Sequence, residues 1–330
     1  MKKILALIYC AAAVAFLSAV EENTLQTEYQ RTIVPHIEEN GEIGKIQMQD
    51  EAVLQYLQIN NNDRTTALVF LGGHTESYVK YYELFYDIRD IGATIYALDL
   101  RGQGFSDRML PDREKDHIDS YEIYIQDLNH FMKEVVAAGN HARVIILGCS
   151  LGGAVAAGYA EQYPDTISGL ILSSPYLSTT ANSFVMFFLR VLNFFGAGKK
   201  YVPGGGPYEP VPFEENKETH SRERHERKLK DYEENPSLRL GYPTIRWMVE
   251  TEKMGRKVRK NAKLITSPIL VFQAEYDEYA DHADQNKFCS AAGNCTKIFL
   301  EDAYHELLIE RDSTRDKVLM HIRDFIENIK

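Results

Sequence analysis

The feature that most constrains the fold is the sequence Gly148-Cys149-Ser150-Leu151-Gly152, which lies between two different hydrophobic patterns. The preceding run Arg143–Leu147 is short and apolar, as in a buried strand, and apolar residues at helical spacing follow from Leu151. A serine in a sharp turn from strand to helix needs small residues two positions before and after it, because larger side chains would clash with neighbouring backbone. The pattern therefore predicts that Ser150 is a nucleophile held at the end of a strand.

Short apolar runs alternate with amphipathic segments along most of the chain. The runs are continuous rather than alternating with polar residues, which is typical of parallel strands buried on both faces. Between them, apolar residues such as Val79, Tyr82 and Tyr86 recur at helical spacing. This alternation predicts an α/β fold with a mostly parallel sheet and helices on both faces. The expected strands are Gly44–Gln49, Val53–Ile59, Ala67–Leu71, Ala93–Leu98, Val144–Leu147, Ile167–Leu172, Ile269–Phe272 and Lys297–Leu300.

The alternation is interrupted between about Tyr176 and Thr266. This region holds an apolar stretch, a loop rich in Gly and Pro, and a highly charged segment, and the strand pattern resumes only at Pro268. We interpret it as a helical cap over the carboxyl ends of the strands. The predicted organisation is an N-terminal signal or anchor (1–20), the first part of the core (21–175), the cap (176–266) and the second part of the core (267–330). Within the first part, Glu21–Asn40 is expected to be a polar lead-in.

The N-terminus has the pattern of an export signal. Lys2 and Lys3 precede an apolar run, Ile4–Val20, which has small residues near its end. We expect a cleaved secretory signal peptide, and therefore a periplasmic or secreted protein; the alternative is an uncleaved membrane anchor, because the run is about long enough to span a bilayer. Cys289 and Cys295 are expected to form a disulfide in an exported protein or to remain as two free thiols.

A serine hydroxyl needs a base, and the base needs an orienting acid. In folds with this type of turn, the three residues follow one another along the chain in the order serine, acid, histidine. Asp277 follows one predicted strand and His305 follows the last, so both belong to loops at the carboxyl edge of the sheet, where such folds place their active sites. His305 is therefore the expected base and Asp277 the expected acid, with Asp281 and Glu275 as alternatives in the same loop.

A tetrahedral intermediate also needs backbone N–H donors for its oxyanion. The turn itself supplies the N–H of Leu151. The second donor is expected from the loop Gly72-Gly73-His74-Thr75, and we assign it to the N–H of His74. The sequence Asp99–Gly104 lacks the spacing of a dinucleotide-binding loop, and we expect it to shape the floor of the pocket.

These residues resemble the bacterial lysophospholipase and monoacylglycerol lipase branch of the α/β-hydrolases. The resemblance extends from about Gly44 to the C-terminus. The segments that carry it are Glu76-Ser77-Tyr78-Val79-Lys80-Tyr81, Asp99-Leu100-Arg101-Gly102-Gln103-Gly104, Gly148–Gly153, Ala303-Tyr304-His305-Glu306 and, in the cap, Pro207–Phe213 and Thr219–Arg222.

The resemblance implies an α/β-hydrolase fold, a triad of Ser150, Asp277 and His305, and no metal or organic cofactor. The chain departs from the family at one loop, where the usual His-Gly pair reads Gly72-Gly73. This departure puts the hydrogen bonds that support the oxyanion loop in doubt. The acid position varies in lysophospholipase relatives, which keeps Asp281 open, and an export signal is not expected from them.

The cap bears on the substrate. The stretch Ser183–Phe195 is apolar nearly all round, so we expect most of it to be packed against the core. The functional alternative is an acyl tunnel or a lid that touches a membrane, with Phe184, Phe187 and Phe188 as candidate substrate-binding residues. The charged stretch around Arg222, Arg224, His225 and Arg227 is expected to be a solvated face, or alternatively to meet a phosphate headgroup.

The net charge of −11, from 37 basic and 48 acidic residues, argues against nucleic acid as a partner. For the same reason, we expect any peripheral membrane contact to depend on apolar surface. The predicted function is hydrolysis of a monoacyl lipid ester through an acyl-Ser150 intermediate, with a lysophospholipid favoured over a monoacylglycerol. The alternatives are a lipid acyltransferase that uses the same intermediate and a non-catalytic lipid-binding relative.

Overall fold

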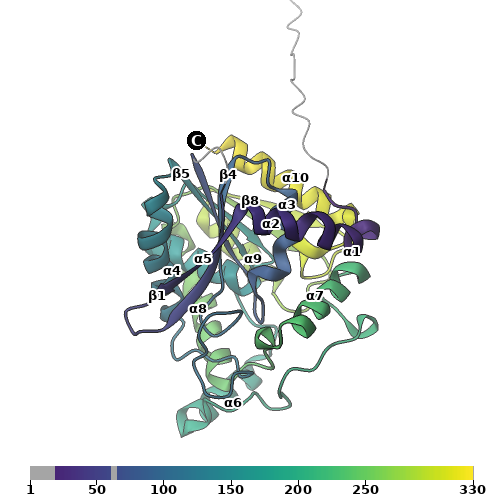
Figure 1. The fold of residues 1–330 in the computed structure, drawn as a ribbon. Helices are drawn as coiled ribbons and strands as arrows, with labels where there is room; N and C mark the ends of the chain where they lie inside the picture. Colours follow the sequence, from purple (N-terminus) through teal and green to yellow (C-terminus); the bar gives the residue numbers. More distant parts are fainter. Residues whose placement is uncertain (1–18, 61–64, 330) are drawn as a thin grey trace, which may run out of the picture.

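The structure is a computed structural model that describes residues 19–60 and 65–329. Its strands form one sheet in the order β1-β2-β4-β3-β5-β6-β7-β8 (Figure 1). β1 and β2 are antiparallel to their neighbours, whereas every pair from β4 to β8 is parallel, which confirms the mostly parallel sheet. The strands are β1 Gly41–Gln47, β2 Val53–Ile59, β3 Thr66–Leu71, β4 Ala93–Leu98, β5 Arg143–Cys149, β6 Gly169–Ser173, β7 Ile269–Ala274 and β8 Cys295–Leu300.

Helices cover both faces of the sheet. Side chains alternate between the faces, so Ala67 and Val69 of β3 enter one apolar cluster while Leu68 and Phe70 enter the other. The first cluster is closed by α4, α5, α8 and α9, and the second by α1, α2, α3 and α10. The helices are α1 Leu25–Glu28, α2 Val34–Asn40, α3 Tyr82–Asp87, α4 Glu122–Phe131, α5 Ser150–Gln162, α6 Ser183–Leu192, α7 Arg222–Glu234, α8 Ile245–Asn261, α9 His282–Ala292 and α10 Asp312–Asn328.

The segment Glu21–Asn40 is not the polar lead-in expected from the sequence. It contains α1 and α2, which the turn Tyr29–Ile33 joins into one helical stretch along the sheet. Its buried residues recur every four positions, which is the signal that the sequence interpretation missed, and they pack into the cluster with α3 and α10. They are Leu25, Tyr29, Ile33 and Ile37.

The insertion between β6 and β7 contributes α6, α7 and α8. In Figure 1, α6 lies at the lower end of the molecule, opposite the chain's C-terminus, and α7 lies to its right. α8 differs from α6 because its residues Met254 and Val258 are buried against α5 in the main core. The insertion thus ends in a helix that is shared with the core, and the domain limits drawn from the sequence stay a prediction.

The expected solvated face around residues 222–227 of α7 is wrong for three of the four residues named for it. Arg224, His225 and Arg227 are all buried, whereas Arg222 is exposed. Burial is tolerated because the guanidinium groups are paired: Arg224 binds Glu83, and Arg227 binds Asp231.

Residues 1–18, and with them most of the predicted signal, lie outside the described residues. Among the helices of residues 19–60 and 65–329, none is long and apolar enough to cross a membrane.

Candidate active site

Ser150 sits in a strained turn between β5 and α5. Its φ angle is +47°, a left-handed value that a serine adopts only under constraint from its surroundings. The glycines around it explain how the turn fits. A Cβ atom on Gly152 would lie 2.3 Å from the carbonyl oxygen of Leu71, and one on Gly148 would lie 2.6 Å from that of Gly152. The sequence requirement for small residues on both sides of Ser150 therefore has a direct steric cause.

Ser150, His305 and Asp277 form one hydrogen-bonded chain. The Ser150 hydroxyl lies 2.9 Å from Nε2 of His305, and Nδ1 of His305 lies 2.8 Å from both carboxylate oxygens of Asp277. Asp277 Oδ1 also accepts the backbone N–H groups of Tyr279 and Ala280, each at 2.9 Å. The acid is thus fixed by its own loop while it orients the imidazole.

The environment favours the negatively charged form of Asp277 and the positively charged form of His305. Burial alone would raise the pKa of Asp277, but its contacts with His305 and two backbone amides outweigh burial and lower that pKa below its ordinary value. Burial would likewise lower the pKa of His305, but Asp277 outweighs it and raises that pKa. The pair therefore favours a carboxylate next to an imidazole that readily accepts a proton.

The two alternative acids have other partners. Asp281 caps α9 by accepting the N–H of Asp284 at 2.9 Å, and Glu275 accepts the N–H of Asp302 at 2.7 Å. Of the three candidate acids, the structure brings Asp277 to His305.

The oxyanion loop is supported by residues that replace the missing His-Gly pair. The buried carboxylate of Glu76 accepts the N–H of Gly73. The carboxamide of Gln103 donates to the carbonyl oxygen of Gly73 at 2.6 Å and accepts the N–H of Thr75 at 3.2 Å, so it clamps the loop on both sides of His74. Gln103 belongs to the Asp99–Gly104 segment, none of whose residues lines the cavity at Ser150, so these contacts give the segment a role in supporting the oxyanion loop and the expected role at the pocket floor stays a prediction.

The two expected oxyanion donors flank Ser150. Leu151 lies in the first turn of α5, where backbone N–H groups have no acceptor within the helix. On the other side, a Cβ atom on Gly73 would lie 3.1 Å from Cβ of Ser150, so the loop before His74 comes close to the nucleophile. The His74 ring has partners other than the triad: its Nε2 lies 2.8 Å from Asp116 Oδ2, and its centroid lies 4.4 Å from that of the tilted Trp247 ring. The donor roles of His74 and Leu151 stay a prediction.

A cavity of about 780 Å³ opens above Ser150 and His305. The insertion between β6 and β7 supplies much of its wall. Tyr208 and Val211 come from the loop before α7, Tyr232 from α7 itself, and Trp247 and Met248 from α8. The volume lies within the range of small-molecule pockets, about 300–1,000 Å³.

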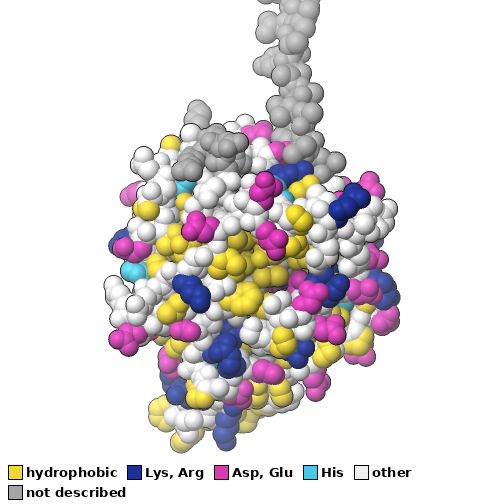
Figure 2. Space-filling model, in the orientation of Figure 1, with side chains coloured by type: hydrophobic (Ala, Val, Ile, Leu, Met, Phe, Trp, Pro, Cys, Tyr) yellow, Lys and Arg dark blue, Asp and Glu magenta, His cyan; other side chains and the backbone are white. Residues whose placement is uncertain are grey.

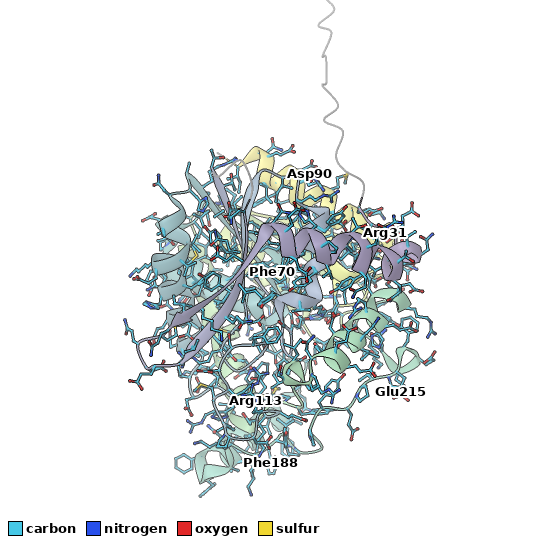
Figure 3. All side chains as sticks on the ribbon, in the orientation of Figure 1. Arg31, Phe70, Asp90, Arg113, Phe188 and Glu215 are labelled. Atoms are coloured by element: carbon cyan, nitrogen blue, oxygen red, sulfur yellow. A yellow bond between two sulfur atoms is a disulfide. The ribbon has the colours of Figure 1, made fainter. Side chains whose placement is uncertain are left out.

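Phe184, Phe187 and Phe188 do not line this cavity. Their exposed fractions are 77%, 61% and 47%, and Figure 3 shows Phe188 at the lower edge of the molecule, pointing away from the body. Only one side of α6 is buried, through Met186 and Leu189. The expectation that most of Ser183–Phe195 is packed is therefore wrong, and these phenylalanines are not placed to line an acyl tunnel in the cavity.

Sequence reasoning missed a buried ion cluster beside the nucleophile. Lys80 Nζ lies 2.6 Å from Glu76 Oε1 and 2.6 Å from Glu306 Oε1, and the side chains of all three are at least nine-tenths buried. Both segments carry the family resemblance, but no local pattern indicates that residues 80 and 306 meet. The cluster joins the oxyanion loop to the loop of His305.

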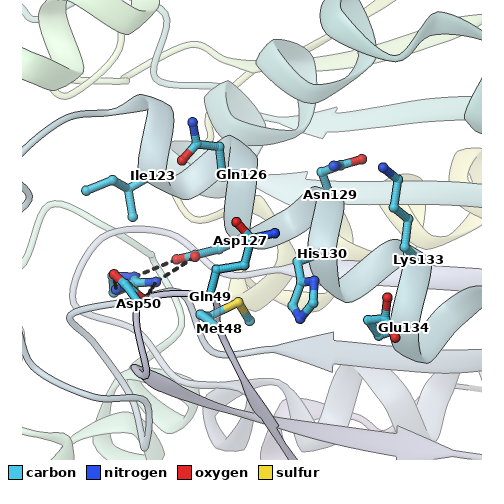
Figure 4. Close-up of a pocket in the computed structure, with 11 residues that line it drawn as sticks. Met48, Gln49, Asp50, Ile123, Gln126, Asp127, Asn129, His130, Lys133 and Glu134 are labelled. Atoms are coloured by element: carbon cyan, nitrogen blue, oxygen red, sulfur yellow. Dashed lines mark hydrogen bonds and ion pairs between the residues drawn. The ribbon is translucent and has the colours of Figure 1, made fainter.

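A second hollow of about 640 Å³ lies away from Ser150, against α4 (Figure 4). Its lining contains neither serine nor cysteine among the described residues. Arg101 at its edge is saturated by carboxylates, since it binds Asp127 through Nε and Nη2 and Asp50 through Nη1 and Nη2. This hollow holds no nucleophile and base pair like the one at Ser150.

Comparisons with known proteins agree with this geometry. The family model described as "Serine aminopeptidase, S33" matches residues 62–312. Lysophospholipase L2 of Escherichia coli K12 is 31% identical over 287 residues, which cover 84% of each chain. Monoacylglycerol lipase of Mycolicibacterium smegmatis is 22% identical over 265 residues, which cover 78% of this chain and 79% of the relative.

The fold is similar to that of solved α/β-hydrolases. A soluble variant of monoglyceride lipase from Saccharomyces cerevisiae matches with a TM-score of 0.71 at 19% identity, covering 88% of this chain and 95% of that one. The predicted fold class is confirmed. The chain belongs to the serine aminopeptidase S33 family of α/β-hydrolases and, within it, to the bacterial lysophospholipase and monoacylglycerol lipase branch.

Proposed function

We propose that this protein hydrolyses the ester bond of a monoacyl lipid, a lysophospholipid in the first place and a monoacylglycerol in the second, through an acyl-Ser150 intermediate. The observation that carries the proposal is the continuous hydrogen-bonded chain from Ser150 through His305 to Asp277 at the base of a capped cavity. The choice of a lysophospholipid rests on the lysophospholipase L2 relative, which is more similar in sequence than the monoacylglycerol lipase.

In the first half of the reaction, His305 Nε2 takes the proton of the Ser150 hydroxyl as its Oγ attacks the ester carbonyl carbon. The resulting oxyanion is stabilised by the N–H groups of Leu151 and His74. Asp277 keeps Nδ1 of His305 protonated and stabilises the imidazolium. His305 then gives its proton to the leaving oxygen of the glycerol part, and the acyl group remains on Ser150.

In the second half, His305 removes a proton from water, whose oxygen attacks the acyl carbon and releases the fatty acid. If a lipid hydroxyl replaces water in this step, the product is a new ester rather than a fatty acid. The cavity wall combines aromatic and aliphatic residues with polar and charged ones. At about 25 cal/mol per Å² of apolar surface buried, an acyl chain of about a dozen carbons gains several kcal/mol on burial.

Replacement of Ser150 tests the proposal directly. We expect Ser150→Ala to abolish both lipid hydrolysis and covalent labelling by a fluorophosphonate. Thr180→Ala is a matched control, because Thr180 lines the same cavity but bonds only to the backbone of Glu278 and has no base beside it. Ester cleavage retained by pure Ser150→Ala protein would overturn the assignment.

A lipid panel then separates the substrate classes. Fatty acid release is measured from lysophosphatidylcholine, lysophosphatidylethanolamine and monoacylglycerol, each with and without an added lipid alcohol. Fatty acid as the main product supports hydrolysis. Transfer of the acyl chain to the added alcohol would identify an acyltransferase instead.

The exposed phenylalanines of α6 and of the helical turn Asn193–Ala197 that follows it form the surface we assign to membrane contact. Phe184, Phe187, Phe188, Phe194 and Phe195 are all exposed, and Figure 2 shows hydrophobic side chains at this lower end of the molecule. Exposed apolar patches of this kind mark interaction sites. The occupant we assign is a lipid bilayer, because a monoacyl lipid substrate resides there. The net charge of −11 disfavours electrostatic binding to anionic lipid, so this contact would depend on the apolar side chains.

Vesicle binding tests this surface. We expect the double substitution Phe187→Ser and Phe188→Ser to reduce sedimentation with neutral phosphatidylcholine vesicles. Ile43→Ser is the matched control, because Ile43 is similarly exposed but lies on β1. Equal vesicle binding by the two variants would show that α6 is not the membrane-binding surface.

Export is the localisation we propose. Beyond the N-terminal pattern, Cys289 at the end of α9 and Cys295 at the start of β8 form a disulfide, a bond typical of oxidising compartments. Cell fractionation of the full chain tests it, and a chain found only in the cytosol would contradict it.

A further inference from the structure

The first described residues of the chain are anchored in a cluster of buried and half-buried charges. The backbone N–H of Val20 donates to Asp87 Oδ1 at 3.0 Å, and the carbonyl oxygen of Val20 accepts from Arg224 at 3.3 Å. Ala19 and Val20 also pack against the apolar cluster that holds α3 and α10. Both polar backbone groups of Val20 are therefore bound, although Val20 lies only two positions before the first helical turn, Glu22–Thr24.

The carboxylate that receives the Val20 N–H is poorly compensated. Asp87 is fully buried, and its other oxygen binds Arg315 at 2.7 Å. Burial, together with the neighbouring Glu83, outweighs Arg315 and raises the pKa of Asp87 above its ordinary value. A second positive charge at the position of the Val20 nitrogen would stabilise this carboxylate.

The wider cluster has the same acidic excess. Arg224 is shared among three carboxylates: it lies 2.8 Å from Glu83, 2.7 Å from Asp312 and 3.4 Å from Glu22. Glu22 in turn places its own backbone N–H 3.0 Å from Asp312. Together with Asp87, four carboxylates thus surround two guanidinium groups at the point where Val20 enters.

The sequence places a processing signal at this point. The apolar run that follows Lys2 and Lys3 ends with the small residues Ser18 and Ala19, and acidic residues begin at Glu21. The recognition feature of signal cleavage is a small residue directly before the cut bond, paired with a small residue two positions earlier. Ala19 supplies the first of these before Val20, and Leu17 occupies the second position, so the choice of this bond rests on the anchoring of Val20.

We propose that the bond between Ala19 and Val20 is the signal cleavage site, and that the new α-ammonium group of Val20 forms an ion pair with buried Asp87. The host's signal peptidase hydrolyses this peptide bond: the hydroxyl of water joins the carbonyl carbon of Ala19, and the nitrogen of Val20 gains the other proton of water. At neutral pH the new carboxyl group of Ala19 loses a proton and becomes a carboxylate, and the Val20 nitrogen takes up a second proton and becomes an ammonium group. The inference rests on the proposed export and extends it.

The ion pair would connect processing to the cap. Arg224, which holds the carbonyl group of Val20, belongs to α7, and the same helix lines the active-site cavity through His225 and Lys228. Binding of the new N-terminus by Asp87 and Arg224 therefore stabilises the position of α7, which forms part of the cavity wall.

The first experiment determines the N-terminus of the exported protein. The full chain is produced in an exporting bacterial host, and the periplasmic or secreted product is examined by N-terminal sequencing and intact mass. We expect Val20 as its first residue. Ala19→Leu should cause precursor to accumulate, whereas Ala15→Leu, the matched control at the alternative small-residue motif Ala13-Val14-Ala15, should leave processing unchanged.

The outcomes are distinguishable. An exported product that begins at Phe16, or one that keeps its leader, would overturn the cleavage site while leaving export intact. A product confined to the cytosol would instead contradict export itself.

The second experiment tests the ion pair. Two proteins are released from a removable N-terminal fusion, one beginning at Val20 and the other with a single glycine before Val20, which turns the ammonium nitrogen into an amide. We expect the melting temperature of the first to be higher by roughly 2–4 °C. When both proteins carry Asp87→Asn, this difference should vanish. If the two proteins with Asp87 intact have equal melting temperatures, the ion pair is overturned, whatever the Asp87→Asn variants show.

Discussion

Lys80 Nζ lies 2.6 Å from Glu306 Oε1, although 226 positions separate the two residues in the chain. The same ammonium group binds Glu76, whose other carboxylate oxygen accepts the N–H of Gly73. Because Glu306 follows His305 directly, Lys80 connects the oxyanion loop to the loop of the base. Burial alone would lower the pKa of Lys80, but Glu306 and Glu76 outweigh it and raise that pKa, so the lysine stays charged.

We expect Lys80→Met to lower kcat/KM by roughly tenfold to a hundredfold, which corresponds to about 1.4–2.8 kcal/mol of transition-state stabilisation. The reason is that Glu76 and Glu306 lose their shared cation, so both loops relax. Loss of one partner from a buried ion cluster also costs about 3–5 kcal/mol of folding stability, and the kinetics must therefore be measured well below the melting temperature of the variant.

Two further variants control this test. Lys80→Arg keeps the charge and should recover part of the activity, and Lys217→Met removes an exposed lysine that pairs with Glu278 and should change little. A folded Lys80→Met enzyme with unaltered kcat would show that the cluster serves stability alone.

Asp277→Asn should reduce kcat by a factor on the order of 10⁴, because the amide no longer fixes the tautomer of His305 or stabilises its charged form. Asp281→Asn is the matched comparison in the same loop. Asn caps helices as well as Asp does, so α9 and the activity should both be preserved. Steady-state kinetics of both variants decide the matter, and a larger loss at position 281 would reverse the assignment of the acid.

The central strands β3 to β7 were predictable because they are largely buried on both faces and leave continuous apolar runs. Val53–Ile59 and Ala93–Leu98 have the same limits in the sequence prediction and in the structure, and the other strands differ by a few residues at their ends. The turn at Ser150 was predictable for a steric reason, since only small residues fit at positions 148 and 152. Local pattern was sufficient in these cases.

The remaining features depend on contacts between distant parts of the chain. A charged sequence such as Arg222–Glu234 is expected to face solvent, and only the three-dimensional fold shows that Arg224 meets Glu83 across 141 positions. For the apolar stretch at α6 the error was the opposite one, since burial was predicted and exposure is observed. Met186 and Leu189 pack the helix against its neighbours, and its phenylalanines stay exposed. Composition alone therefore predicted burial wrongly for both α6 and α7.

Removal of the disulfide should cost stability but not activity. Cys289 and Cys295 are six positions apart, so the bond closes a short loop and contributes less than the roughly 3 kcal/mol of a 15-residue loop. We expect the double substitution to serine to lower the melting temperature by a few degrees and to leave kcat/KM unchanged. A mass difference of two hydrogens between oxidised and reduced wild-type protein would verify the bond, and free thiols in exported protein would contradict it.

The dependence of activity on pH should follow His305. The base must be neutral to accept the Ser150 proton, and its pKa is raised because Asp277 outweighs burial, so kcat/KM should rise to its plateau through a pKa above the ordinary value of about 6.5. Asp277→Asn should move this inflection to lower pH, and Glu306→Gln should move it in the same direction by less, since Glu306 is the weaker of the two influences.

Folding stability should show the opposite trend for the same residue. A group whose pKa is raised by folding stabilises the native state fully below its unfolded pKa, and this contribution is lost as pH rises through the folded value. For Asp277, whose pKa is lowered, the contribution is present above the unfolded pKa near 3.9 and is lost as pH falls through the folded one. Denaturant unfolding of wild type and Asp277→Asn between pH 5 and 9 measures the His305 part. If the two proteins lost stability in parallel across that interval, the raised pKa of His305 would not arise from its contact with Asp277.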